Sequence, residues 1–137
     1  MLEDAFLILN SCRCLGCYEV LVSTHQYNYF MCPCENHTFT GGGTSYIHRG
    51  GEDMFLVKSQ DIFSDAEHSI LRTVVCRGGY GKKGEEHYRV TRLADMSDAY
   101  LAASIEFVSI HPTQNKYLQI YRNEVEYRQL HNIRIED

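Results

Sequence analysis

Cysteine spacing is the feature that most constrains how this chain can fold. Five of its six cysteines lie between residues 12 and 34, in the segment CRCLGCYEVLVSTHQYNYFMCPC. Two residues separate Cys14 from Cys17, one residue separates Cys32 from Cys34, and fourteen residues lie between the two pairs. A structural Zn²⁺ takes four nitrogen or sulfur ligands in a tetrahedron, and hairpins supply them in pairs that are close in sequence. The spacing therefore predicts a zinc ribbon with the ligands Cys14, Cys17, Cys32 and Cys34.

Other arrangements of the thiols stay open at this point. Cys12 could take the place of Cys14 and pair with Cys17, and buried free thiols need no metal at all. His25 or His37 could replace a thiolate, although four cysteines already fill a tetrahedral shell. Cys76 stands apart from the others, and we expect it to pack in the interior as a free thiol.

The compartment that the sequence indicates also favours metal over disulfides. The first residues, MLEDAFLILN, lack the basic start and the cleavage site of a secretory signal. No apolar stretch approaches the roughly 18 residues that a membrane span needs. We therefore expect a cytoplasmic protein without a membrane partner, in which thiols stay reduced and clustered cysteines bind metal.

The charge of the chain limits the kinds of partner that it can bind. The formal net charge is −5, and the 13 Lys and Arg residues are scattered along the chain. Duplex DNA binding depends on many phosphate contacts from such side chains. Nucleic acid is therefore a less favoured partner than protein.

Length and pattern predict an α+β fold in a single domain spanning residues 1–137. A cysteine-rich β half covers about residues 1–58, and a mainly helical half covers about residues 59–137. Residues 18–24 and 27–32 are rich in β-branched and aromatic types and predict two strands joined as a hairpin near His25 and Gln26. Further strands are predicted at residues 46–47, 54–57 and 87–93.

Three helices are predicted in the second half. Ser64 and Glu67 have the spacing of a capping box, which starts a helix that runs to about Arg77, before two glycines. Ser97 is a candidate N-cap for a helix over residues 98–110, which is apolar all round and is therefore expected to be buried or covered. Pro112 ends that helix, and a third covers about residues 114–131.

The third helix carries a predicted ion pair and part of a predicted binding surface. Glu124 and Arg128 are four residues apart with the acid first, and both fall within the apolar arc of the helix, so we expect a buried pair. Tyr100, Tyr117 and Tyr121 lie on the second and third helices, and tyrosine supplies a large contact area with a polar end. We expect these tyrosines to form a partner-binding face.

A glycine turn raises a second possibility. Gly41, Gly42 and Gly43 are followed by Arg49, and backbone N–H groups with a guanidinium could hold a phosphate. The alternative is a tight turn without a ligand. The later segment GYGKKG lacks the glycine spacing and the Ser or Thr of a P-loop, so it predicts no nucleotide site.

With these segments in place, the sequence resembles a family of small, uncharacterised zinc-ribbon proteins encoded mainly by bacteriophages. The resemblance rests on the CxxC and CxC pairs, STH ending at His25, the run TGGGTSY with Arg49, the stretch YGKKGEEHYRVTRLADMS, and the closing NEVEYRQLHNIRIED. Glu35, Thr40 and Tyr100 depart from the family pattern. The resemblance implies a zinc ribbon, a phage origin and hence the cytoplasm of a bacterial host, but no activity.

These observations favour a non-enzymatic binding module that engages a host protein or defence complex during infection. An apolar helical surface would also suit a homo-oligomer. The alternatives are a binder of a small nucleotide or signalling ligand and a nucleic-acid-binding accessory protein. No residue is predicted to be catalytic.

Overall fold

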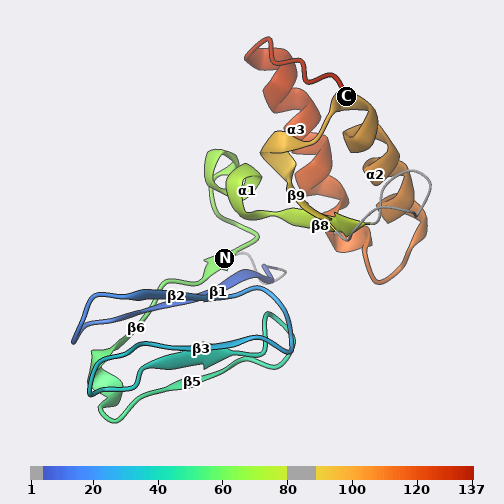
Figure 1. Cartoon of the computed structure of the whole chain (residues 1–137). Coiled ribbons are helices and arrows are strands. Elements are labelled where there is room, and N and C mark those ends of the chain that lie inside the picture. The colour runs from blue at the N-terminus through green and yellow to red at the C-terminus, as the bar shows by residue number, and fades with distance from the viewer. Residues whose placement is uncertain (1–4, 80–88) are drawn as a thin grey trace. The chain divides into compact units, whose positions relative to one another are not determined.

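The computed structural model describes residues 5–79 and 89–137. Its internal contacts divide the chain into two compact units, residues 1–66 and 67–137, which we call the N-terminal and C-terminal units. The boundary between the units falls eight residues beyond residue 58, where the β half was predicted to give way to the helical half. That both halves form one domain stays a prediction. Among the described residues, antiparallel strands fill the N-terminal unit, and the C-terminal unit has three α-helices with an antiparallel strand pair between the first and second in sequence (Figure 1), which confirms the α+β class.

The first sheet of the N-terminal unit is built around β1 (Leu7–Cys14). One side of β1 pairs with β2 (Val20–Ser23), and the other pairs with β6 (Val57–Ser59). The short β7 (Ile62–Phe63) pairs with the beginning of β1. All of these pairs are antiparallel, so residues from both ends of the unit meet on one strand.

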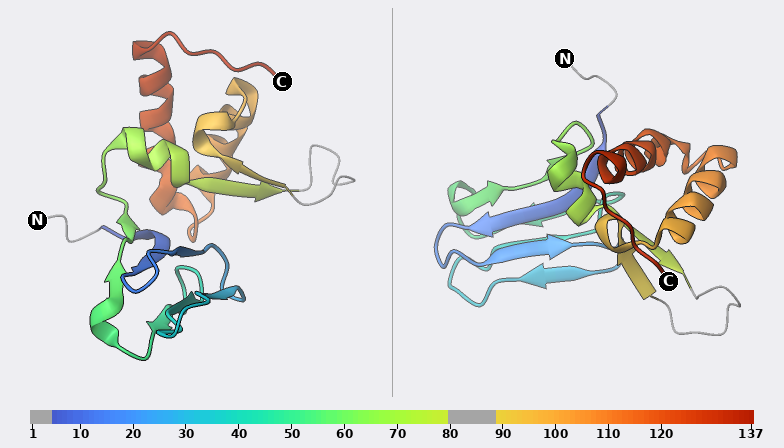
Figure 2. Two further views of the ribbon diagram at one scale, coloured as in Figure 1. Left: turned by 60° about the vertical axis from the view of Figure 1, so that its left-hand side comes forward. Right: turned by 90° about the horizontal axis from the view of Figure 1, so that it is seen from above.

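The second sheet joins β3 (Tyr29–Met31), β4 (Phe39–Gly41) and β5 (His48–Gly50) in sequence order. It is antiparallel, and Figure 2 shows its strands beside those of the first sheet within the unit. The apolar core of the unit is small and consists mainly of thiols. Its buried members are Cys12, Cys14, Leu21 and Cys32, with Cys17, Cys34 and Val57 packed against them.

The predicted hairpin between residues 18–24 and 27–32 is wrong. Its two strands form as β2 and β3, but they belong to different sheets, because β2 pairs with β1. The sequence pattern predicts no strand at Leu7–Cys14, where β1 forms. The turn between β2 and β3 is instead closed by Asn28, whose side-chain oxygen accepts hydrogen bonds from the backbone N–H groups of Thr24 and His25.

Two shorter predictions for the N-terminal unit also need correction. Residues 54–57 do not form a strand: Met54–Leu56 is a 3₁₀ turn, η1, and only Val57 belongs to β6. The Asp53 carboxylate accepts a hydrogen bond from Phe55 N at 2.9 Å and so caps this turn. The strand expected at residues 46–47 begins two residues later, at His48.

The C-terminal unit starts with α1 (His68–Val74), which is shorter than predicted. The capping box does not form, because Ser64 Oγ accepts a hydrogen bond from Phe6 N at 2.9 Å and Glu67 caps no backbone group with its side chain. Residues 76–79 leave the helix as β8 (Cys76–Gly79), which pairs with β9 (Arg89–Arg92). The predicted strand at 87–93 is therefore confirmed at its centre, and residues 87 and 88 lie outside the described residues.

The predicted bounds and N-cap of the second helix are confirmed. The helix α2 spans Asp98–Ile110, and Ser97 Oγ accepts a hydrogen bond from Tyr100 N at 3.0 Å. Only one side of α2 is buried, with Leu101, Ser104 and Val108.

The third predicted helix begins as a 3₁₀ turn, η3 (Asn115–Tyr117), and continues as α3 (Leu118–Leu130). Another 3₁₀ turn, η2 (Leu93–Asp95), links β9 to α2. The core of the C-terminal unit contains Leu71, Val75, Leu93, Met96, Leu101, Val108, Ile120 and Tyr121. No helix in residues 5–79 or 89–137 has the length and apolar character needed to cross a membrane.

Candidate metal centre

The first pair of cysteines lies on a tight turn at the end of β1. Cys14 is the last residue of the strand, and a turn over residues 15–17 brings Cys17 back toward it. The turn closes with a hydrogen bond of 2.7 Å from Tyr18 N to Cys14 O. Tyr18 has φ 64, a left-handed conformation that is uncommon for a residue with a side chain.

The second pair follows β3 and forms a similar turn. Cys32 N donates to Thr38 O at 2.8 Å, and His37 N donates to Cys34 O at 3.0 Å. His37 has φ 48, so each cysteine turn ends on a left-handed residue. The two turns come from different sheets, yet both point their thiols toward one place.

The four sulfur atoms are close enough to hold one metal ion. The Sγ atoms of Cys14, Cys17, Cys32 and Cys34 all lie within 4.8 Å of one another. The Sγ of Cys34 lies 3.5 Å from that of Cys14 and 3.4 Å from that of Cys32. A tetrahedron with metal–sulfur bonds of about 2.3 Å has edges of about 3.8 Å. The separations therefore fit a tetrahedral tetrathiolate site.

The thiol of Cys14 has a lowered pKa and therefore ionises more readily than an ordinary cysteine. Burial raises its pKa, but hydrogen bonds from the Thr38 side chain and from the backbone N–H groups of Cys17 and Gly16 lower it to about 6. Gly16 N lies 3.4 Å from Cys14 Sγ. A thiolate at this position is thus stabilised by the Thr38 side chain and by backbone dipoles of its own turn, as a metal ligand requires.

The thiols of Cys17 and Cys34, whose pKa values are raised, resist ionisation unless a cation is present. The backbone N–H of Asn36 lowers the pKa of Cys34, but the adjacent Cys32 thiol and burial outweigh it and raise the pKa to about 12. Once one thiolate has formed, each further negative charge in the cluster is opposed by those already there. A divalent cation removes this repulsion, and a coordinated thiol loses its proton outright.

The other cysteines and histidines are not part of this cluster. Among the described residues, the four cysteines are the only group of three or more His, Cys, Asp or Glu whose ligand atoms converge in this way. Cys12 is fully buried in the core beside the cluster, where burial raises the pKa of its thiol. Cys76 is exposed, so its predicted packing in the interior is wrong. His37 instead lies 3.8 Å from a carboxylate oxygen of Glu52.

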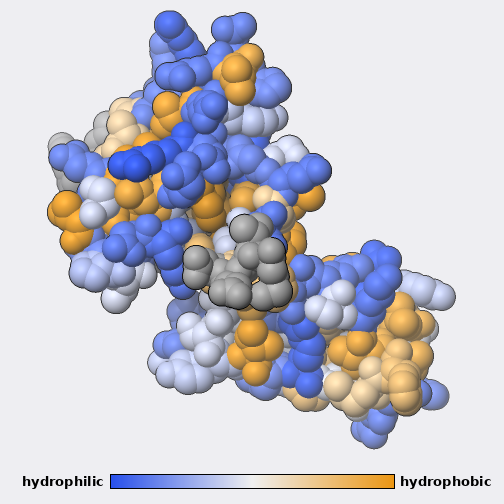
Figure 3. All heavy atoms as spheres, turned by 180° about the vertical axis from the view of Figure 1, so that it is seen from behind, coloured by the Kyte–Doolittle hydropathy of each residue, from blue (hydrophilic) through white to orange (hydrophobic). Residues whose placement is uncertain are grey.

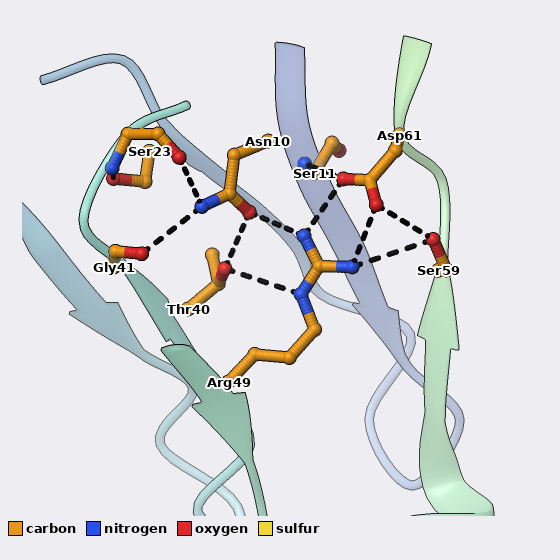
Figure 4. A network of polar contacts seen from close by, with 9 residues as sticks. Asn10, Ser11, Ser23, Thr40, Gly41, Arg49, Ser59 and Asp61 are labelled. Carbon is orange, nitrogen blue, oxygen red and sulfur yellow. Dashed lines mark hydrogen bonds and ion pairs between the residues drawn. The ribbon is translucent and has the colours of Figure 1, made fainter. Parts of the chain in front are cut away.

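The guanidinium of Arg49, which was predicted to contact a phosphate, is already hydrogen-bonded to groups of the protein. Its Nη1 and Nη2 atoms donate to the Asp61 carboxylate at 3.0 and 2.7 Å, and Nη2 also donates to Asn10 Oδ1 (Figure 4). Its Nε donates to Thr40 Oγ1 at 3.4 Å. Both members of the ion pair are only 14% exposed. Arg49 therefore joins the two sheets of its unit instead of offering its charge to a ligand.

The glycine turn is also closed on itself. Gly42 N donates to Asn28 O at 3.2 Å, and Gly43 N donates to Ser23 Oγ at 2.9 Å. Gly42 has φ +83, and a Cβ there would lie 1.8 Å from Tyr46 O, so the position requires glycine. These hydrogen bonds support a tight turn. Because both N–H groups are already bonded, neither can donate to a phosphate.

Sequence reasoning missed two residues that organise this network. Asn10 is fully buried and donates from Nδ2 to Gly41 O and Gly43 O at 3.0 and 2.7 Å. Asp61 also accepts from Ser11 N at 2.9 Å. Neither residue stands in a recognisable motif, since their partners are distant in sequence.

The predicted tyrosine face is only partly accessible. Tyr121 is 3% exposed, so its ring belongs to the core and cannot lie in a binding surface. Burial raises its pKa to about 12. Tyr100 and Tyr117 are half-buried, and the ring of Tyr117 is stacked with that of Tyr121 at 6.4 Å.

The Glu124–Arg128 pair lies at the centre of the C-terminal unit. Arg128 Nε donates to Glu124 Oε2 at 2.8 Å, and the two side chains are 4% and 0% exposed. Glu124 also accepts two hydrogen bonds from Arg72 and contacts His68 Nε2 at 2.9 Å. Arg128 further donates to Leu93 O, which ties α3 to the turn before α2.

Comparison with known proteins gives one family match. Residues 6–51 are similar to a domain of unknown function (DUF7695), and this stretch includes all four clustered cysteines. No curated protein and no solved structure matches the chain significantly.

Proposed function

We propose that this protein is a small zinc-ribbon binding module in which the metal holds the fold and the protein acts by contacting another protein. The observation that carries the proposal is the convergence of four thiols within 4.8 Å. Four thiolates fill a tetrahedral Zn²⁺ shell and leave no open position for a substrate or water. The metal is then structural, and the protein needs a function other than metal catalysis.

The composition of the core supports a structural role for the metal. Three of the four buried residues in the core cluster of the N-terminal unit are cysteines, and the fourth is Leu21. Small units with so little apolar core usually depend on a metal or disulfides for stability. Binding free energy at such a site is folding free energy.

The partner we propose is a protein of a bacterial host, bound in the cytoplasm. The support for the host is the resemblance to phage-encoded zinc-ribbon proteins. The alternative of a nucleotide or signalling ligand is less well supported. It relied on Arg49 and on the N–H groups of the glycine turn, and Arg49 and the N–H groups of Gly42 and Gly43 are hydrogen-bonded within the protein.

Metal analysis of the purified full chain tests the structural core of this proposal. Elemental mass spectrometry should find one zinc per chain in the wild type. Cys17→Ser should lower the zinc content well below one and remove the cooperative unfolding of the N-terminal unit. Cys76→Ser, which replaces an exposed thiol outside the cluster, is the matched control and should retain the metal.

Less than half an equivalent of metal in wild type purified without chelator would contradict the proposal. So would equal zinc contents in Cys17→Ser and wild type. Capture of a defined protein from host lysate by the wild type, and its loss in Cys17→Ser, would support the binding role. Native mass spectrometry of the same samples would reveal a co-purified nucleotide, which would favour the alternative.

A further inference from the structure

One face of the second sheet is formed by exposed aromatic and apolar side chains. In an antiparallel sheet, directly paired residues share a face and neighbours along a strand alternate. The pairs Tyr29–Gly41 and Gly41–His48 therefore share a face with the pair Met31–Phe39. We call the side chains of Tyr29, Met31, Phe39 and His48 the aromatic face.

The side chains of this face pack on one another but remain accessible. The ring of Tyr29 lies 5.5 Å from that of Phe39 and is stacked on that of His48 at 5.8 Å. Tyr29 is 48% exposed and Met31 47%. A cluster of adjoining rings that are partly open to solvent is typical of a surface that another molecule covers.

Two glycines leave room for the rings of His48 and Phe39. A Cβ at Gly41 would lie 2.9 Å from the His48 ring, and one at Gly50 would lie 3.1 Å from the Phe39 ring. The rings therefore rest on backbone where side chains would otherwise push them away. The opposite face of the same sheet is different, since Thr40 and Arg49 point into the buried polar network (Figure 4).

The face continues toward a hydrophobic end of the N-terminal unit. The Met54 sulfur lies 3.6 Å from the Cβ position built at Gly50, and Met54 and Phe55 are 59% and 93% exposed. Figure 3 shows hydrophobic residues gathered at one end of this unit. Glu52 and Asp53, both exposed, directly precede them in sequence.

The sign of the surrounding charge selects the partner. Residues 1–66 contain eight acidic and three basic residues, and one of the three, Arg49, is bound to Asp61. A Zn²⁺ ion with four thiolates would add a net charge of −2. Nucleobases can also stack on aromatic faces, but they bring phosphates that need a basic groove. A second copy of this unit would bring the same negative charge.

We infer that the aromatic face binds a segment of another protein that carries arginine or lysine among apolar side chains. Guanidinium groups stack on aromatic rings and pair with carboxylates such as those of Glu52 and Asp53. This inference rests on the proposed function, because it names the surface and the partner chemistry of that binding module. The partner is distinguished from nucleic acid and from a second copy by charge.

Peptide titration of the zinc-loaded full chain tests the inference. The probes are two synthetic peptides of equal length, one alternating arginine and leucine and one alternating glutamate and leucine, with an unstructured single-stranded RNA as a third. Binding is followed by backbone amide shifts in NMR spectra. The arginine peptide should bind, shift the amides of β3, β4 and β5, and bind more weakly as salt is raised. The glutamate peptide and the RNA should not bind.

Tyr29→Ala should weaken binding of the arginine peptide by about tenfold, the order expected for an aromatic contact at the centre of an interface. The matched control is Phe30→Ala, on the same strand but the other face, with a similar exposure of 46%. It should leave the affinity within about twofold of wild type.

Several results would overturn the inference: equal binding of both peptides, preferential binding of RNA, equal effects of Tyr29→Ala and Phe30→Ala, or self-association of the chain through this face. Zinc content is measured on every sample. If the chain is folded and zinc-loaded but does not bind the arginine peptide, this inference alone is refuted. If the chain contains no metal, the proposed function is refuted.

Discussion

Glu124 is the position where a single substitution should destabilise the C-terminal unit most. Its carboxylate is fully buried and accepts hydrogen bonds from Arg72 and Arg128, with His68 Nε2 at 2.9 Å. Glu124→Leu introduces an apolar side chain of similar size, removes the anion of Arg72 and His68, and leaves Arg128 with the half-exposed Asp98 carboxylate alone. Removing one partner of a buried pair costs about 3–5 kcal/mol.

The structure also predicts the order of the effects. After Glu124→Leu, Arg72 and His68 keep some contact with water at 15% and 17% exposure, whereas Arg128 is 4% exposed. Most of the cost should therefore come from Arg128, whose remaining anion, Asp98 at 2.8 Å, is half-exposed and does not reach the Nε that Glu124 accepts from. Arg128→Leu should cost less, about 2–3 kcal/mol, because Glu124 retains Arg72 and His68. The double variant Glu124→Leu/Arg128→Leu should be more stable than Glu124→Leu alone.

The pH dependence gives a second readout of the same group. Burial raises the pKa of Glu124, but hydrogen bonds from Arg72, Arg128 and His68 outweigh it and lower the pKa below the ordinary range. Stability from this group is therefore present at neutral pH and is lost as the pH falls from that range through the lowered pKa. Glu124→Gln should show a weaker loss of stability with acid than wild type.

Urea unfolding followed by circular dichroism of the helices is the assay, because all described α-helices lie in the C-terminal unit. Glu126→Leu, an exposed site on the same helix, is the control and should change the free energy of unfolding by less than about 0.5 kcal/mol. If Glu124→Leu and Arg128→Leu each cost less than about 0.5 kcal/mol, the value of a surface pair, the reasoning about burial is wrong.

Three further predictions concern the N-terminal unit. Gly42→Ala should destabilise it by more than about 1 kcal/mol in thermal unfolding, because the Cβ would overlap Tyr46 O; a smaller effect would mean that the turn can relax. Burial raises the pKa of Asp61, but the hydrogen bond from Arg49 and others lower it, so its stabilisation is present at neutral pH and lost in acid. Asp61→Asn should flatten this acid dependence in unfolding curves measured from neutral to acidic pH. Cys12→Ser should keep one metal ion per chain by elemental analysis, and loss of the metal would restore Cys12 as a ligand.

Local sequence was sufficient for three features whose stabilising interactions are local, whereas the local capping box of Ser64 and Glu67 did not form because Ser64 bonds to the distant Phe6. The helix Asp98–Ile110 could be predicted because Ser97 caps it directly and Pro112 follows it closely. The cysteine set could be predicted because each pair is held by one turn, whose hydrogen bonds join residues three to six apart. Glu124 and Arg128 could be placed together for the same reason, since one helical turn separates them.

Long-range pairing decided the rest. The sequence by itself determined which thiols converge, where α2 runs and that a strand-rich half precedes a mainly helical half. Only the tertiary structure decided that β2 pairs with β1 and that the Arg49 guanidinium donates its hydrogen bonds to Asp61 and Asn10. It also decided that Tyr121 is buried while Tyr29 is exposed. These outcomes depend on partners that lie distant in the chain or on which face of an element is covered. Periodicity and spacing carry no information about such partners, so the accessible aromatic surface had to be found in the folded protein.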